Sequence, residues 1–189
     1  MTRLLAYGLA VFFLGLSRPA SEAATIAGVT FDPEVEFAGE RFGLHGVGLF
    51  RYRVMFRAYV GALYIGKGHS VDDLWSPETP VRLELEYFWP IAGDRFGPAA
   101  VPFLKDNLSA EDFERIQSRA DQLSGMYEDV RAGDRAALTF IPGRGTELTL
   151  NGKSLGMIEG DDFASAYLRI WLGERPIDDR FRDQILSGT

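Results

Sequence analysis

The sequence predicts an α+β domain with an antiparallel sheet. Extended segments rich in β-branched and aromatic residues dominate the chain up to Phe88, helical segments follow, and a second extended region precedes the last helices. Regular alternation of strands and helices, which a doubly wound parallel sheet would need, is absent from this pattern. Between two extended runs lies Asn151-Gly152, a pair typical of the type I′ turn of an antiparallel hairpin.

The expected strands follow from runs of β-forming residues. Residues 25–31, 35–46 and 54–66 are extended runs separated by turn residues, and Arg135 to Ile141 is another. Residues 80–88 alternate strictly, which predicts a half-buried strand with one solvated face. Its expected buried residues are Val81, Leu83, Leu85 and Tyr87, and its expected solvated residues are Arg82, Glu84 and Glu86.

Four helices are expected after these strands. Residues 94–108 have helical spacing, but Pro98 and Pro102 predict an irregular helix there. Residues 109–112 resemble a capping box that opens a helix. A third helix is expected to begin at Asp161-Asp162 and to end at Gly173, and a fourth to begin with Pro176 in its first turn. The apolar stripe of the second helix consists of Phe113, Ile116, Ala120 and Leu123.

The first 23 residues have the features of a secretory signal peptide. A basic start at Arg3 precedes an apolar run from Leu4 to Leu16 and a small-residue cleavage site at residues 21–23. The alternative is an uncleaved anchor helix, but 13 apolar residues are fewer than the roughly 20 that span a bilayer. Cleavage would leave residues 24–189 as one periplasmic or secreted domain without an integral membrane segment.

Charge and cysteine content exclude several classes of function. Loss of Arg3, Arg18 and Glu22 with the signal peptide leaves 18 basic and 26 acidic residues, a net charge of −8 that argues against a nucleic-acid partner. The chain has no cysteine, so disulfides, thiolate metal sites and cysteine nucleophiles are excluded. We expect neither a metal nor a cofactor.

Few residues suit catalysis. His45 and His69 are the only histidines, and neither accompanies a G-x-S-x-G turn, which argues against a serine hydrolase. Haem binding would require His45 as a ligand. Asp161-Asp162 fits the start of a helix better than a metal site, and residues 142–147 fit a tight turn better than a phosphate loop.

Three arginines interrupt the apolar, glycine-rich stretch of residues 46–64. If residues 50–59 formed one strand, Arg51, Arg53 and Arg57 would share a face with Tyr59, and alternation alone would place them in solvent. The alternative is that one guanidinium reaches an apolar cavity and binds a ligand carboxylate or carbonyl oxygen, a contact that contributes about 1.5–3 kcal/mol. The pattern leaves both interpretations open.

Several separated motifs together resemble one known family. The segments LHGVGLFRYRVMFRAYVGALYIG, LELEYF, AGDRAALTFIPGRGTEL and NGKSLGMIEGDDFASAYLRIWLGERPID are similar to the bacterial, exported branch of the chalcone isomerase-like family, over residues 30–187. This resemblance implies an open-faced β-sandwich, in which an antiparallel sheet carries a helical layer on one face and a cleft lies between the two.

The resemblance also implies site residues. In the plant enzymes an arginine at the end of the glycine-rich strand stabilises the charge that develops as a chalcone closes to a flavanone. In related non-catalytic members the arginine holds a fatty-acid carboxylate. Arg51 matches it by its position after the GVG motif, and Tyr59 falls where a threonine is expected. Phe113, Ala120 and Ile170 fall where the enzymes have polar residues that orient the chalcone.

Loss of this polar network favours a non-catalytic binder over an enzyme. We expect a lipophilic, acidic small molecule, such as a fatty acid, to be bound by Arg51, Tyr59 and Phe113 in the cleft. One alternative is an isomerase (intramolecular lyase) of the chalcone isomerase type with another substrate and Arg51 as its catalytic residue. Another is a domain without a pocket that interacts with other envelope proteins.

Overall fold

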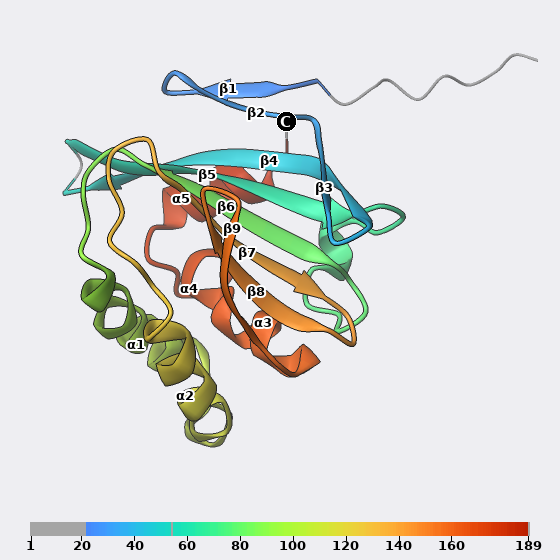
Figure 1. The fold of residues 1–189 in the computed structure, drawn as a ribbon, viewed down its shortest axis with the longest axis vertical. Coiled ribbons are helices and arrows are strands. Elements are labelled where there is room, and N and C mark those ends of the chain that lie inside the picture. Colours follow the sequence, from blue (N-terminus) through green and yellow to red (C-terminus); the bar gives the residue numbers. More distant parts are fainter. Residues whose placement is uncertain (1–21, 54, 189) are drawn as a thin grey trace, which may run out of the picture.

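The computed structural model describes residues 22–53 and 55–188 and contains a seven-stranded antiparallel sheet with helices on one face (Figure 1). The predicted signal peptide, residues 1–23, lies almost entirely outside the described residues. Each strand of the sheet pairs with the next one along the chain, which confirms the antiparallel α+β prediction. The strands are β3 (Glu34–Phe37), β4 (Glu40–Tyr52), β5 (Phe56–Gly66), β6 (Val81–Tyr87), β7 (Arg135–Ile141), β8 (Gly145–Leu150) and β9 (Lys153–Ile158).

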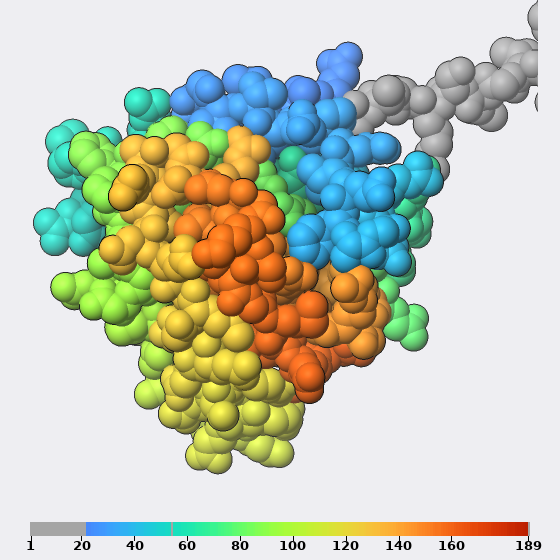
Figure 2. Space-filling model, in the orientation of Figure 1, coloured from blue at the N-terminus to red at the C-terminus, as the bar shows by residue number. Residues whose placement is uncertain are grey.

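Helices cover one face of this sheet, and a separate two-stranded hairpin crosses the other (Figure 1). In the space-filling view the hairpin lies along one end of the molecule and α2 forms the opposite end (Figure 2). The main hydrophobic cluster lies between sheet and helices. The helices are α1 (Phe96–Asn107), α2 (Ala110–Ser124), α3 (Asp161–Tyr167), α4 (Arg169–Leu172) and α5 (Asp179–Leu186), with 3₁₀ turns η1 (Val71–Asp73) and η2 (Gly93–Arg95); the hairpin consists of β1 (Ala24–Ile26) and β2 (Val29–Phe31).

Three of the predicted helices differ in the structure. The helix expected to run from Asp161 to Gly173 is divided into α3 and α4, with Leu168 between them, and it ends at Gly173 as predicted. The predicted irregularity of α1 is wrong: the helix is continuous over 12 residues, because Pro98 lies in the first turn and Pro102 removes only one internal donor. The last helix begins at Asp179 rather than near Pro176, because the Asp178 carboxylate accepts a hydrogen bond from the Phe181 backbone N–H at 2.7 Å.

The predicted turns and the cap of α2 are confirmed. Asn151 and Gly152 have φ values of 50° and 78°, as a type I′ turn requires. The Ser109 hydroxyl accepts a hydrogen bond from the Asp112 N–H at 3.1 Å, and α2 begins at the next residue, Ala110.

The segment that contains the three arginines is a hairpin, so the premise of a single strand over residues 50–59 is wrong. Strand β4 ends at Tyr52, Arg53 has a φ of 48°, and β5 begins at Phe56. Arg51 therefore pairs directly across from Arg57, and Phe50 from Tyr59. Directly opposed residues share a face of the sheet.

The glycines of β4 and β5 allow α5 to approach the sheet closely. A Cβ atom at Gly46 would lie 2.2 Å from the backbone oxygen of Ile185, and one at Gly61 would lie 2.6 Å from the Phe181 ring. The Phe181 ring instead fills the space that the missing side chains leave and is fully buried. The GVG motif is therefore explained by the packing of the last helix.

Replacing Gly46 by alanine is expected to destabilise the fold by about 1–3 kcal/mol, because the colliding atom belongs to the backbone of α5 and cannot move alone. Gly43 on the same strand is the matched control, since a Cβ atom there meets nothing within 4 Å. Urea denaturation of both variants tests this. Equal free energies of unfolding for Gly46→Ala and Gly43→Ala would contradict it.

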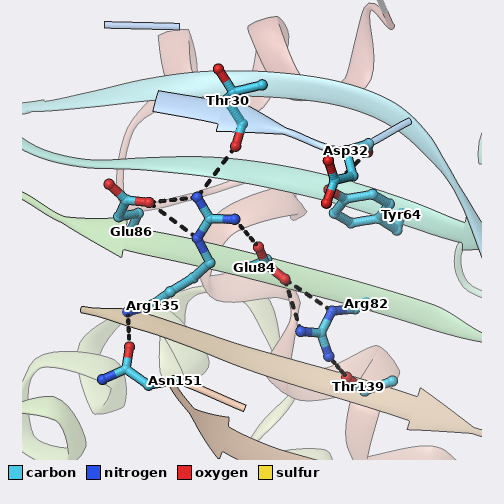
Figure 3. Close-up of polar contacts among 9 residues, drawn as sticks. All are labelled: Thr30, Asp32, Tyr64, Arg82, Glu84, Glu86, Arg135, Thr139 and Asn151. Atoms are coloured by element: carbon cyan, nitrogen blue, oxygen red, sulfur yellow. Dashed lines mark hydrogen bonds and ion pairs between the residues drawn. The ribbon is translucent and has the colours of Figure 1, made fainter. Parts of the chain in front are cut away.

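The face of β6 opposite the helices is not solvated, so that expectation is wrong. Glu84 is 5% exposed and lies beneath the N-terminal hairpin (Figure 3). Its carboxylate forms ion pairs with Arg82 Nη2 at 2.8 Å and with Arg135 Nη1 at 2.9 Å. Arg135 also pairs with Glu86 and donates to the Thr30 carbonyl of β2 at 3.3 Å. The charged side chains of this face therefore pair with one another, whereas alternation predicted that they would be hydrated.

Candidate functional site

A cavity of about 570 Å³ lies between the sheet and the helical layer. Pockets of this size commonly hold small molecules. Its walls are almost entirely apolar. Several of the lining side chains are short, among them Ala100 on α1 and Ala136 on β7, where larger residues would fill the core. The cavity is the expected cleft between sheet and helices, and the alternative of a domain without a pocket is wrong. Other lining residues include Leu83, Leu85, Leu138, Leu148, Phe96 and Ile170.

The cavity opens near the tip of the β4–β5 hairpin. Tyr52, Phe56 and Trp89 line it there, and each has more than half of its surface exposed. Arg95, the charged residue among those that line the cavity, lies in the connection between β6 and α1. Its guanidinium is mostly exposed and lies 3.6 Å from the Asp94 carboxylate. Charge is therefore available only at the mouth.

Tyrosines supply the polar groups of the interior. The Tyr59 hydroxyl accepts a hydrogen bond from Trp171 Nε1 at 3.1 Å, and Tyr87, Tyr127 and Tyr167 also line the cavity. Burial raises the pKa of Tyr59 well above its usual value, and the Trp171 hydrogen bond opposes this only in part. Burial likewise raises the pKa values of Tyr87 and Tyr127. The tyrosines therefore present neutral hydroxyls at physiological pH.

Alkaline pH is expected to destabilise the fold through these tyrosines. Burial raises the pKa of Tyr167 to about 12 from 10.0, and the adjacent Tyr127 acts in the opposite direction. Because the raised pKa belongs to the folded state, the stabilisation is complete below pH 10 and is lost as pH rises towards about 12. Urea denaturation near neutral pH and at about pH 11 should show this loss, and Tyr167→Phe should reduce it. An equal loss in that variant would contradict the assignment.

The structure separates the residues that the sequence suggested as a site. Tyr59 lines the cavity. Arg51 is exposed and is not among the lining residues. Leu49, two residues before it on β4, packs on the hairpin side of the sheet. Arg51 pairs with Arg57, whose guanidinium lies 5.2 Å from the Phe88 ring on that side. It therefore lies on the opposite face from the cavity.

Phe113 does not line the cavity either. It is partly buried on α2, and Lys105 Nζ lies 5.2 Å from its ring centroid. Ala120 is buried in the main hydrophobic cluster, as expected for a core residue. Ile170 is buried too, and it lines the cavity.

Several lining residues were not predicted as site residues. Alternation placed Tyr87 in the core, and Tyr167 belongs to the helix predicted to begin at Asp161-Asp162. The sequence signal for a site at these two positions is the hydroxyl, since a buried hydroxyl requires a polar partner. Tyr127 follows α2 in a connection without periodicity, and Arg95 belongs to η2, so no sequence signal marked either of them.

The remaining candidates have structural roles. His45 Nε2 lies 3.0 Å from the Leu186 carbonyl oxygen at the end of α5. Asp162 pairs with Arg119 at 2.7 Å, and Asp161 accepts a hydrogen bond from the Gly143 N–H. Within residues 22–53 and 55–188, no group of three or more His, Cys, Asp or Glu side chains could hold a metal ion. None of the helices described there is long and apolar enough to cross a membrane.

Comparisons with known proteins agree with this architecture. The sequence matches the family described as chalcone isomerase-like over residues 23–187. No curated protein matches it. The fold is similar to the crystal structure of an Arabidopsis thaliana fatty-acid binding protein, with a TM-score of 0.66 and 18% sequence identity, over 88% of this chain and 96% of that one. The family match spans most of the chain, and the chain therefore belongs to the chalcone isomerase-like family.

Proposed function

We propose that this protein is a non-catalytic carrier of a lipophilic, acid-bearing small molecule of the fatty-acid type. The observation that carries the proposal is the apolar cavity of about 570 Å³ with a charged group only at its mouth. Fatty-acid binding by the Arabidopsis protein of similar fold supports it. An acyl chain suits such walls, since burying apolar surface contributes about 25 cal/mol per Å².

The polar groups of the cavity decide how such a ligand would lie. An ionised carboxylate would be costly in the interior, where the polar side-chain groups are neutral tyrosine hydroxyls and the Trp171 indole N–H. The acid group is therefore placed at the mouth, within reach of Arg95, and the acyl chain inside. The hydroxyls of Tyr59 and its neighbours suit a neutral oxygen along the chain, such as a carbonyl or a hydroxyl.

An isomerase of the chalcone type is the second candidate, and the lining gives it less support. General acid–base catalysis at neutral pH needs a group whose pKa lies near 7. The titratable groups of the lining are Arg95, the exposed Tyr52 and four tyrosines whose pKa values burial raises. Arg51, the residue that would stabilise a developing oxyanion, lies on the other face of the sheet.

The cellular location completes the proposal. A signal peptide over residues 1–23 would export the domain to the periplasm or beyond the cell, as in the bacterial exported branch of the family. Expression of the full chain in a bacterium, followed by cell fractionation and N-terminal sequencing, tests this. Export with Ala24 as the first residue is expected, and a cytoplasmic protein that retains Met1 would contradict it.

Ligand binding is tested on protein purified without detergent. Mass spectrometry of the organic extract is expected to find stoichiometric acyl species, and delipidated protein is expected to bind a fluorescent fatty acid. Arg95→Ala should weaken binding of the fatty acid about tenfold or more, because one charge-assisted contact is lost, and should leave the matching fatty alcohol unaffected.

Arg51→Ala is the matched comparison, since it removes the same charge from the other face of the sheet. Its fatty-acid affinity is expected to equal that of the unaltered protein. A large loss in Arg51→Ala together with none in Arg95→Ala would restore the assignment of Arg51 as the ligand-binding arginine. Absence of any acyl species and of any fatty-acid affinity would overturn the proposed function.

A further inference from the structure

The large apolar side chains that the described residues leave exposed gather at one place. They are Met55, which is 78% exposed, and Tyr52, Phe56 and Trp89, which are 52–56% exposed. Three lie at the tip of the β4–β5 hairpin, and Trp89 is tied to β5 because its Nε1 donates to the Arg57 carbonyl at 2.8 Å. We call these four residues the tip patch.

The hairpin that carries most of the tip patch projects beyond the rest of the sheet. The β4–β5 hairpin is the teal segment that extends furthest to the left in Figure 1, and its side chains form the projecting teal group at the left edge of Figure 2. Large apolar side chains that are exposed singly are normal on a protein surface, whereas a group of them exposed together marks an interaction site.

Arginines surround the tip patch. Arg51, Arg53 and Arg57 belong to the same hairpin and are exposed, and among the described residues none of them has an acidic partner within 4.0 Å. Arg53 lies 5.3 Å from the Tyr52 ring, and Arg95 lines the adjacent cavity mouth. The chain as a whole has a formal net charge of −7, so this concentration of positive charge is local.

The same surface is the entrance of the cavity. Tyr52, Phe56 and Trp89 belong both to the tip patch and to the cavity lining. Whatever covers the tip patch therefore also faces the opening through which a ligand must enter.

We propose that the tip patch docks onto the surface of an anionic phospholipid bilayer, with the cavity mouth open to the acyl region. Aromatic side chains favour the boundary between headgroups and acyl chains, and arginines beside them favour anionic headgroups. A lipophilic ligand then moves between bilayer and cavity without crossing water. This transfer role rests on the proposed function, whereas docking itself does not require it.

The shape of the surface favours a bilayer over a protein partner. A stable protein interface buries about 800 Å² on each side and needs a broad complementary face. Three side chains on a projecting hairpin, with Trp89 beside them, form a narrower surface, which suits shallow insertion between lipids. The unpaired arginines need only diffuse negative charge, which a bilayer supplies over its whole surface.

Flotation of the purified protein with vesicles tests the docking. Binding is expected to vesicles of phosphatidylcholine mixed with phosphatidylglycerol, to weaken with added salt, and to be about tenfold or more weaker for phosphatidylcholine alone. Met55→Asp and Arg53→Glu should each reduce binding to the mixed vesicles about tenfold or more. Arg180→Glu is the control, because it makes the same charge change at an exposed position on α5, and it should bind normally.

Neither Met55 nor Arg53 lines the cavity, so both variants should bind fluorescent fatty acid in solution as well as the unaltered protein does. Binding to vesicles without any affinity for fatty acid would contradict the proposed function but would support the docking. No binding to anionic vesicles would overturn the docking, as would binding that Met55→Asp and Arg53→Glu leave unchanged. The docking is also overturned if Met55→Asp abolishes co-purification of a protein partner and leaves vesicle binding intact.

Discussion

Replacing Ala136 by phenylalanine is expected to remove most of the affinity for a lipophilic ligand and to leave the fold intact. The Ala136 side chain lies on the sheet side of the cavity. On β7, Ala136 pairs with Leu85 of β6 and with Leu150 of β8. A phenyl ring there enters existing empty space, so it displaces the ligand rather than the neighbouring side chains. Affinity for a fluorescent fatty acid should fall about a hundredfold, a change of about 2.8 kcal/mol in binding free energy.

Ser154→Phe is the control for Ala136→Phe. Ser154 is an exposed residue of β9, so this variant adds the same ring to the same sheet outside the cavity. Circular dichroism and urea denaturation should show both variants folded, and the ring in the cavity should, if anything, stabilise the ligand-free protein by burying apolar surface. A folded Ala136→Phe with unchanged affinity would place the ligand outside this cavity.

Local patterns were enough to predict most of the elements. Alternation in β6 identified Val81 to Tyr87 as a strand, and the Asn151-Gly152 pair identified its hairpin, because each signal depends on neighbouring residues alone. The β4–β5 turn was missed for the same reason. It contains no glycine, proline or asparagine and places Arg53 in the left-handed region, so the pattern reads as one continuous strand.

The candidate site depended on contacts that a local pattern does not contain. Alternation alone placed Arg51 in solvent, and the family resemblance assigned it to a ligand. The face that it occupies follows from the β4–β5 hairpin, in which it pairs with Arg57. The cavity itself is space that Ala100 and Ala136 leave between distant elements. An alanine in a core pattern does not show whether a neighbour fills that space.

The buried ion pairs beneath the N-terminal hairpin give the largest expected effect on stability. Glu84 is the central group: it accepts from Arg82 Nε at 3.1 Å and Nη2 at 2.8 Å, and from Arg135 Nη1 at 2.9 Å (Figure 3). Glu84→Ala leaves Arg82, whose side chain is 13% exposed, with Thr139 as its remaining side-chain partner at 2.7 Å. A buried charge that loses its partner cannot recover hydration, which costs about 3 kcal/mol.

Thermal and urea denaturation of Glu84→Ala should therefore show a loss of about 3 kcal/mol, or about 10 °C in Tm. Glu111→Ala removes a carboxylate whose side chain is 88% exposed and which lies 3.5 Å from Arg115, so this control should lose less than about 1 kcal/mol. Replacing Arg82 and Glu84 together by methionine and leucine should recover much of the stability, because no unpaired charge then remains. If that double variant were as unstable as Glu84→Ala, the cost would come from lost side-chain packing, and the N-terminal hairpin would not depend on the pairing of charge beneath it.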